Sequence, residues 1–306
     1  MTTREEKNKE QFEEIVNDEL RKKKKKKVIF FTKLIVLIIV CLFILYFYVT
    51  YVSTKMITVK EERLKNSKLP ISFNSTKIIQ FSDLHYGTTV KIDEVKNLVK
   101  LINKRHPDIV VFTGDLIDDS YDISTSEQED LIKLLKSINV SIGKYAVSGE
   151  DDGDNFSTIL NQSDFTVLDN NYDLVYNNDN NPILITGLSS SLNGNRNIDN
   201  AFKYFSVENH NANIYSICLI HESDDIDDIL SKYSVDLFLG GHSHNGQIRI
   251  PFYGAISGVE GSSTYYKEHY ELDNSQIYVS SGIGTVGSGI RLFDRPSINF
   301  FRLSNS

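Results

Sequence analysis

Cysteine is scarce in this sequence. Its 306 residues include two cysteines, Cys41 in a long apolar run and Cys218 in a second, strand-like apolar run. A disulfide framework needs several paired cysteines, and a thiolate metal site needs clustered ones. The sequence therefore suggests neither, and a metal site in this chain would use carboxylates and imidazoles.

Basic residues are also scarce beyond the N-terminus. Residues 1–33 hold 11 Lys and Arg against 7 Asp and Glu, whereas residues 34–306 hold 22 against 34. Binding to a phosphate backbone needs clustered positive charge, so nucleic acid is not expected as a main partner. Because 40% of the residues are hydrophobic, the chain can bury a substantial core, and we expect one large domain.

A long apolar run near the N-terminus predicts a transmembrane helix over residues 28–52. From Leu34 to Val52 it offers 19 residues, about the length that crosses roughly 30 Å of hydrocarbon. A cleaved signal peptide is the alternative, but no small-x-small cleavage site follows the run. The run is therefore interpreted as a signal-anchor.

Residues 1–27 are predicted to form a basic tail that ends in seven consecutive positive charges. Within it, residues 1–20 fit a short amphipathic helix or a disordered tail, and we favour the tail. The positive-inside rule places residues 1–27 in the cytoplasm and everything after Val52 outside the cell membrane. Residues 53–75 are interpreted as a polar connector to a domain over 76–306.

Apolar strands alternate with amphipathic helices from residue 77 onward. Lys77–Phe81 and Ile109–Thr113 read as strands on either side of a helix over Ile92–Asn103. Ser126 with Glu129 is read as a capping box that opens the next helix. Such alternation predicts a mostly parallel sheet in an α/β domain. Short segments with Asn-rich turns predict hairpins in the middle of the chain, with Phe165–Asn171 and Asp173–Tyr176 as separate strands.

Carboxylates and imidazoles follow the ends of these apolar runs. The segments are Asp83-Leu84-His85, Gly114-Asp115, Gly149-Glu150-Asp151, His221 and Gly241-His242-Ser243-His244. Glycines beside His242 and His244 let the backbone turn at the end of a strand, so that both imidazoles can point at the same position. Ligands of these types, without cysteine, suit a pair of divalent ions such as manganese, iron or zinc.

This order of motifs resembles the calcineurin-like metallophosphoesterases, whose pattern is D-x-H, G-D-x-x-D, G-N-H-[DE], a lone His and G-H-x-H. The resemblance extends from about Lys77 to the C-terminus. Ser281–Thr285 and Arg291–Phe293 resemble the small, membrane-anchored bacterial branch of that family. The resemblance implies a four-layer α/β/β/α sandwich after the transmembrane helix. It also implies a dinuclear hydrolase that cleaves phosphomonoesters or phosphodiesters.

The resemblance also implies roles for individual residues. Asp115 would bridge two divalent ions, which would acidify a shared water to hydroxide and clamp the phosphoryl oxygens. Asp118 is expected to support the site or pack beside it. The implied ligands of one ion are Asp83, His85 and His244, and those of the other are Glu150, His221 and His242.

The third motif departs from the family pattern, because Glu150 and Asp151 stand where the family has Asn and His. Glu150 can still bind a metal. Asp151 takes the place of the catalytic group near the leaving oxygen, but an ionised carboxylate is a poor general acid. A shift by one residue, with Asp152 and Asp154 involved instead, stays open.

Two function classes follow from this departure. The first is an active metallophosphoesterase with a phosphate-ester substrate. The second is a catalytically weakened protein of the same fold that serves as a metal-binding or regulatory module at the membrane. Asn245 is expected to shape its loop only. We assign no role to three further histidines, His106, His210 and His269.

Overall fold

A computed structural model describes residues 4–193, 195–207, 211, 213–255, 259–287 and 289–305. The chain divides into two units, Met1–Val49 and Thr50–Ser306. His210 lies outside the described residues.

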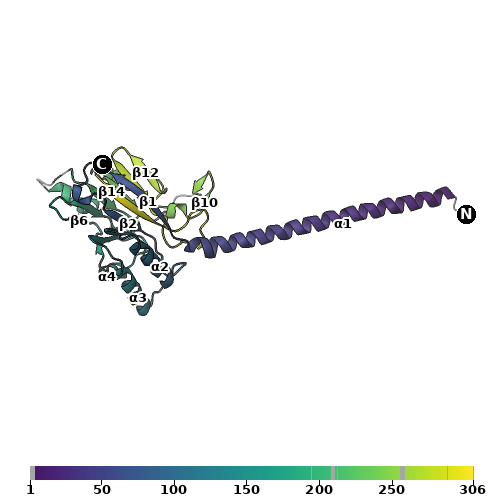
Figure 1. Ribbon diagram of the computed structural model, residues 1–306, viewed down its shortest axis with the longest axis horizontal. Helices are drawn as coiled ribbons and strands as arrows, with labels where there is room; N and C mark the ends of the chain where they lie inside the picture. Colours follow the sequence, from purple (N-terminus) through teal and green to yellow (C-terminus); the bar gives the residue numbers. More distant parts are fainter. Residues whose placement is uncertain are drawn as a thin grey trace. The chain divides into compact units, whose positions relative to one another are not determined.

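The first unit is dominated by helix α1 (Arg4–Phe47; Figure 1). Because α1 begins at Arg4, the prediction of a disordered tail is wrong for residues 4–20. Glu, Lys and Arg favour helix, and Asp18 with Lys22 forms an i,i+4 ion pair of 2.8 Å. Among the described residues, the helical stretch Arg4–Lys55 is long and apolar enough to cross a membrane, as judged by length and composition.

The second unit contains two six-stranded sheets. The first sheet has the order β1 (Thr58–Lys65), β14 (Ser297–Ser304), β2 (Lys77–Phe81), β3 (Ile109–Thr113), β4 (Gly143–Val147) and β5 (Thr166–Val167). The second has the order β12 (His269–Leu272), β13 (Ser275–Val279), β9 (Leu237–Gly240), β8 (Ser216–Leu219), β7 (Ile183–Gly187) and β6 (Asn171–Val175). The helices are α2 (Ile92–Asn103), α3 (Thr125–Lys136), α4 (Asn155–Gln162), α5 (Ile198–Ala201) and α6 (Ile226–Leu230).

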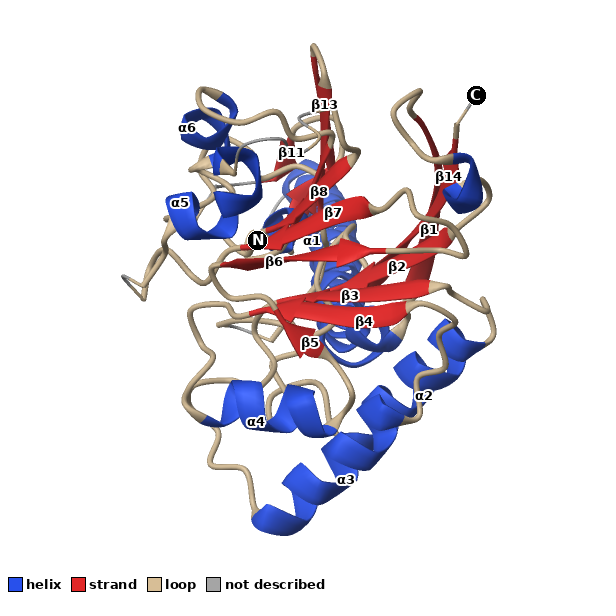
Figure 2. Cartoon of the chain, turned by 90° about the vertical axis from the view of Figure 1, so that its left-hand side faces the viewer, coloured by secondary structure: helices blue, strands red, loops and turns tan. Residues whose placement is uncertain are grey.

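Alternate residues along each strand enter different cores, because successive side chains point to opposite faces. Phe112 packs toward α2, α3 and α4, whereas Val111 joins Leu219 in the core between the two sheets. On the second sheet, Cys218 packs with Ile226 of α6. Figure 2 shows α2–α4 along one sheet and α5 and α6 beside the other. The predicted four-layer α/β/β/α sandwich is confirmed.

Strand β1 lies inside the stretch predicted as a polar connector, residues 53–75. It pairs in parallel with β14 over eight residues, from Thr58 opposite Ser297 to Lys65 opposite Ser304. It forms the edge of the sheet, and Leu64 is its buried residue. An edge strand with polar, exposed side chains has a composition like that of a connector, so its hydrophobic pattern gave no signal.

Two local predictions need correction. The cap of α3 is Ser124, whose hydroxyl accepts from the backbone N–H of Glu127, so the capping box lies two residues before the predicted Ser126 and Glu129. The predicted strand Phe165–Asn171 is shorter, because β5 is only Thr166–Val167 and Asn171 already begins β6 in the other sheet. Asn170 has a positive φ of 56° at the turn between them, a conformation that Asn tolerates better than most residues. The predicted hairpin in this region is confirmed by the antiparallel pair β6 and β7.

Candidate metal centre

The candidate ligands follow the carboxyl ends of strands in both sheets. Asp83 and His85 follow β2, Asp115 follows β3, and Glu150 and Asp151 follow β4. In the second sheet, His221 follows β8, and His242 and His244 follow β9. The structure therefore brings together all eight residues that the sequence singled out.

The backbone at these residues is unusual. Positive φ angles occur at Asp83 (51°), His85 (40°), Asp115 (60°), His242 (66°) and His244 (48°). Non-glycine residues in this region cost free energy and cluster at functional sites. The preceding glycines are needed for space, because a Cβ at Gly114 would collide with His221 and one at Gly149 with Asp115.

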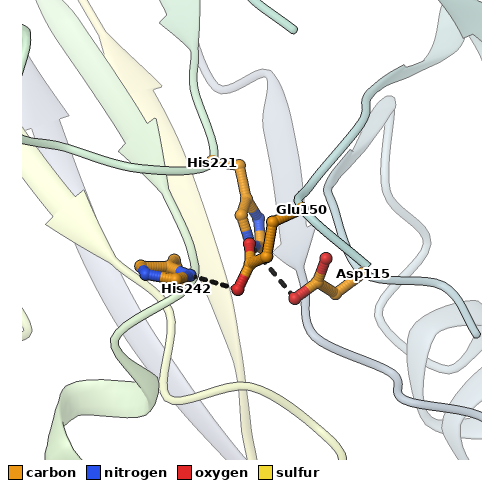
Figure 3. A group of neighbouring side chains, drawn as sticks. All are labelled: Asp115, Glu150, His221 and His242. Atoms are coloured by element: carbon orange, nitrogen blue, oxygen red, sulfur yellow. Dashed lines mark ion pairs between the residues drawn. The ribbon is translucent and has the colours of Figure 1, made fainter. Parts of the chain in front are cut away.

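One cluster is centred on Glu150 (Figure 3). Its Oε2 lies 2.8 Å from Nε2 of His221, and its Oε1 lies 2.6 Å from Nδ1 of His242. Asp115 Oδ2 lies 3.2 Å from the same His221 nitrogen. Ligand atoms of these four residues all lie within 4.8 Å of one another, so they could share one metal ion.

The second nitrogen of each of these imidazoles is already engaged. His221 Nδ1 donates to the carbonyl of Thr113 at 2.5 Å, and His242 Nε2 donates to the carbonyl of Glu260 at 2.6 Å. The inward nitrogens therefore carry lone pairs in the neutral rings, and they face carboxylate oxygens. They and Glu150 Oε2 are buried without a hydrogen-bond partner. Acceptors that face acceptors need a proton or a metal ion between them, so these residues fit a metal ion.

A second cluster contains three buried residues, Asp83, His85 and His244. Nε2 of His244 lies 3.2 Å from Nε2 of His85 and 3.3 Å from Oδ1 of Asp83. Burial lowers the pKa of His244 to about 4, so this imidazole is neutral at physiological pH and has a lone pair to offer.

Asp115 lies between the two clusters. Its Oδ2 is 3.6 Å from His85 Nε2 in one cluster and 3.2 Å from His221 Nε2 in the other. Its other oxygen accepts from the backbone N–H of Asp151 at 3.0 Å. A single carboxylate oxygen is therefore within reach of candidate ligands from both clusters.

The carboxylates make this site strongly negative. Burial lowers the pKa of His85, but carboxylates led by Asp151 outweigh burial and raise that pKa to about 9. Burial also opposes the charged form of His221, yet Asp115 and its neighbours raise the pKa of His221 well above its usual value. A buried site that draws protons onto its imidazoles also attracts divalent cations, which compete with those protons.

The structure separates the roles of three consecutive acidic residues. Glu150 reaches the cluster, whereas Asp152 accepts backbone N–H groups of Asp115, Leu116 and Gly149 at 2.8–2.9 Å. Asp152 belongs to none of the candidate metal-binding groups among the described residues. The geometry therefore favours Glu150 over the alternative with a one-residue shift. Asp151 Oδ2 lies 3.2 Å from His85 Nδ1, and Asp118 Oδ2 lies 3.9 Å from the same nitrogen.

Sequence reasoning missed the residues that support these ligands. Arg291 is fully buried; its Nη2 donates to the carbonyls of Ser281 and Gly284 and lies 3.2 Å from His244 Nδ1. Asn245, expected only to shape its loop, also donates to Asp294 Oδ1 at 3.0 Å. The carbonyls that orient the histidines have no sequence signal, because any residue type supplies one.

Comparison with known proteins identifies the family. The model of a family described as calcineurin-like phosphoesterase matches residues 76–246, more than half of the chain. The chain belongs to this family. The family predicted from the motifs is therefore confirmed, and membership supports a metal-dependent phosphoesterase in a family that uses a dinuclear metal centre.

Similar proteins occur in bacteria and in animals. An uncharacterized metallophosphoesterase of Bacillus subtilis (strain 168), YkuE, is 32% identical over 268 residues, which cover 85% of this chain and 90% of that protein. A second one, from Aquifex aeolicus (strain VF5), is 29% identical over 81% of this chain and 92% of its own length. A transmembrane protein with metallophosphoesterase domain from Danio rerio is 22% identical and matches 76% of this chain and 54% of its own length.

Proposed function

We propose that this protein hydrolyses phosphomonoester or phosphodiester bonds with two divalent metal ions, which are manganese, iron or zinc. The single observation that carries the proposal is the convergence of unpaired buried ligand atoms around Asp115. In this proposal, Asp115 contacts both ions. The remaining ligands are Asp83, His85 and His244 for one ion and Glu150, His221 and His242 for the other.

When bound, the ions supply Lewis acidity at the phosphoryl group and an acidified water as nucleophile. The chain itself supplies orientation. The carbonyls of Thr113 and Glu260 hold His221 and His242 in the tautomers that present a lone pair inward. Glu150 adds a negative charge that the family's Asn would not, which strengthens the hold on a cation.

Asp151 has two tasks in this proposal. As the sequence predicts, it stands beside the leaving group, and its Oδ2 also lies 3.2 Å from His85 Nδ1, where its negative charge holds the imidazole in place. A carboxylate next to two cations stays ionised and cannot protonate a departing oxygen. We therefore expect slow turnover of alkyl esters and faster turnover of aryl esters, whose leaving groups need no proton.

Hydrolysis by the full chain tests the proposal. The purified protein, loaded with each of the three metals, should hydrolyse a bis-aryl phosphodiester. His221→Ala should abolish this activity, whereas His269→Ala, an exposed imidazole of β12, should leave it unchanged. Two ions bound without turnover of any ester would instead support the binding module at the membrane.

Restoring the family pattern tests the departure. The double variant Glu150→Asn, Asp151→His should gain more on alkyl esters than on aryl esters, since positioned acid catalysis contributes about 10² to 10⁴ in rate. Metal occupancy is measured in each variant because Glu150 is itself a proposed ligand. No gain on alkyl esters at full metal loading would show that the missing imidazole is not limiting.

We further propose that the chain is a single-pass protein of the cell membrane with its N-terminus in the cytoplasm and the phosphoesterase domain outside. The apolar stretch within Arg4–Lys55 supports the anchor. The block Arg21–Lys27 precedes that stretch and supports the orientation, because positive charge is retained on the cytoplasmic side.

A further inference from the structure

Large apolar side chains gather on an exposed surface beside the metal centre. Phe252 is fully exposed, and Tyr253 and Phe293 are 76% and 67% exposed. With Ile250, 48% exposed, they line an open hollow of about 420 Å³ around strands β10 (Arg249–Ile250) and β11 (Gly254–Ala255). We call these four residues the aromatic surface. Aromatic side chains are seldom left this exposed without a partner.

The aromatic surface is continuous with a metal-binding loop. The segment after His244 pairs with the segment after Arg291, since the backbone N–H of Arg249 donates to Leu292 O at 2.9 Å and that of Leu292 donates to Gln247 O at 3.2 Å. At one end of this pairing, Arg291 Nη2 lies 3.2 Å from His244 Nδ1. At the other end are Phe252 and Phe293. A molecule on the aromatic surface is therefore next to the loop that holds His244.

The aromatic surface is also close to the end of the predicted membrane span. Thr58, the first residue of β1, donates its backbone N–H to Pro296 O at 2.8 Å, and Pro296 is three residues after Phe293. The predicted span ends at Val52, six residues before Thr58. Six residues reach at most about 20 Å, so the edge of the domain that carries Phe293 stays close to the membrane surface.

The charges beside the aromatic surface fit an anionic bilayer. Among the described residues that line the hollow, the charged ones are Arg249 and Lys267, although the chain beyond residue 33 is acidic. Aromatic rings settle at the headgroup level of bilayers, and basic side chains are attracted to anionic lipids. The lining of the hollow combines both features.

We propose that the aromatic surface docks on an anionic lipid bilayer, and that the metal centre acts on phosphoesters of lipid headgroups at that surface. The second part rests on the proposed phosphoesterase function, whereas the docking does not. The anchor keeps the domain near the bilayer, and the aromatic surface turns the metal-binding loop toward it. A headgroup phosphate can then reach the metal centre while its acyl chains stay in the membrane.

Fluorescence tests the docking, because the chain contains no tryptophan. The full chain with Phe252→Trp is reconstituted in vesicles of phosphatidylcholine and phosphatidylglycerol with brominated acyl chains, and the bromine should quench this tryptophan. The matched control is Tyr176→Trp, which is 53% exposed and follows β6 at the end of the sheet opposite the ligands. It should be quenched by aqueous iodide and not by bromine.

Three results would overturn the docking. The first is quenching of the Phe252→Trp protein by iodide and not by bromine. The second is equal bromine quenching of both proteins. The third is protection of the Phe252→Trp protein from iodide that increases with the number of protein molecules per vesicle and occurs without bromine quenching. That result would show that a second copy of the chain covers the aromatic surface. Bromine quenching of the Phe252→Trp protein should be weaker in neutral vesicles than in anionic ones. It should also be weaker when Lys267→Gln is added to Phe252→Trp.

Hydrolysis tests the substrate class separately. The double variant Phe252→Ser, Phe293→Ser should lose about tenfold in activity on a phosphoester lipid in vesicles and keep its activity on a water-soluble aryl phosphodiester. If the double variant were as active as the parent on the lipid as well as on the soluble ester, the lipid assignment would be overturned. A parent chain that hydrolyses neither ester would refute the proposed function, and the bromine experiment would still decide the docking.

Discussion

Asp115 is the side chain that connects the two clusters of candidate ligands. Its Oδ2 lies within 3.6 Å of imidazole nitrogens from either cluster, and the side chain is 1% exposed. Its Oδ1 accepts the backbone N–H of Asp151, so the loops after β3 and β4 are fixed to each other through this carboxylate. Replacement of Asp115 therefore affects more of the centre than replacement of any ligand that serves one cluster.

We expect Asp115→Ala to lose both metal ions and His85→Ala to lose mainly one. The reason is that His85 contacts one cluster, whereas Asp115 reaches both. Elemental analysis of the purified full chain measures the ions per chain. Asp118→Ala is the control, because its nearest oxygen lies 3.9 Å from His85 Nδ1, outside the proposed ligand set. Two ions retained by Asp115→Ala would contradict the two-metal arrangement.

Metal binding should release protons near neutral pH. The pKa of His85 is raised to about 9, so its imidazole is largely protonated at pH 7.5. A metal ion binds the neutral ring and must displace that proton. Affinity should therefore rise as the pH rises toward 9 and fall as the pH is lowered.

Calorimetric titration of the metal in two buffers of different ionisation enthalpy counts the released protons. His85→Ala should release fewer protons than the parent chain. Proton release that is the same in both proteins would show that the metal displaces no proton from His85.

The helices and inner strands show what this sequence can predict at the level of elements. The bounds of α2 and β3 agree with the sequence prediction, Ile92–Asn103 and Ile109–Thr113, because apolar spacing reports directly which face is buried. Strand β1 buries only Leu64 among its eight residues, so its pairing with β14 leaves no such pattern in the sequence. The convergence of the candidate ligands was predictable from motifs at strand ends. The carbonyls of Thr113 and Glu260 and the buried Arg291 were not, because they depend on contacts between distant segments.

The cap of α3 provides a test at this scale. Ser124→Ala should lower the free energy of unfolding by about 1 kcal/mol, because Ser124 Oγ accepts from the backbone N–H of Glu127. Ser126→Ala, two residues along and inside the helix, is the matched control and should have little effect. Thermal unfolding of the full chain in detergent measures both. The reverse ranking would place the cap at Ser126, as the sequence pattern had indicated.

At the scale of the whole molecule, charge and hydropathy divide the chain into parts with different surroundings. Residues up to 33 carry an excess of basic side chains, and those beyond carry an excess of acidic ones. The apolar helical stretch lies between the basic block and the folded domain. An acidic domain is poorly suited to bind the anionic bilayer over its whole surface, which is consistent with docking restricted to the aromatic surface.

The orientation of the chain can be measured with cysteine labelling, because the native cysteines give little background. Cys218 is buried in the domain, and Cys41 lies within the apolar helix. In the proposed orientation, Ile71→Cys, at an 81% exposed position of the domain, should react with a membrane-impermeant maleimide on intact cells. Asn17→Cys, in the exposed N-terminal part of α1, should react only after lysis.

The physical reason is the block Arg21–Lys27, whose seven charges exceed the five basic residues between Lys55 and Lys68. Labelling of Asn17→Cys on intact cells, with Ile71→Cys protected, would reverse the orientation and place the metal centre in the cytoplasm.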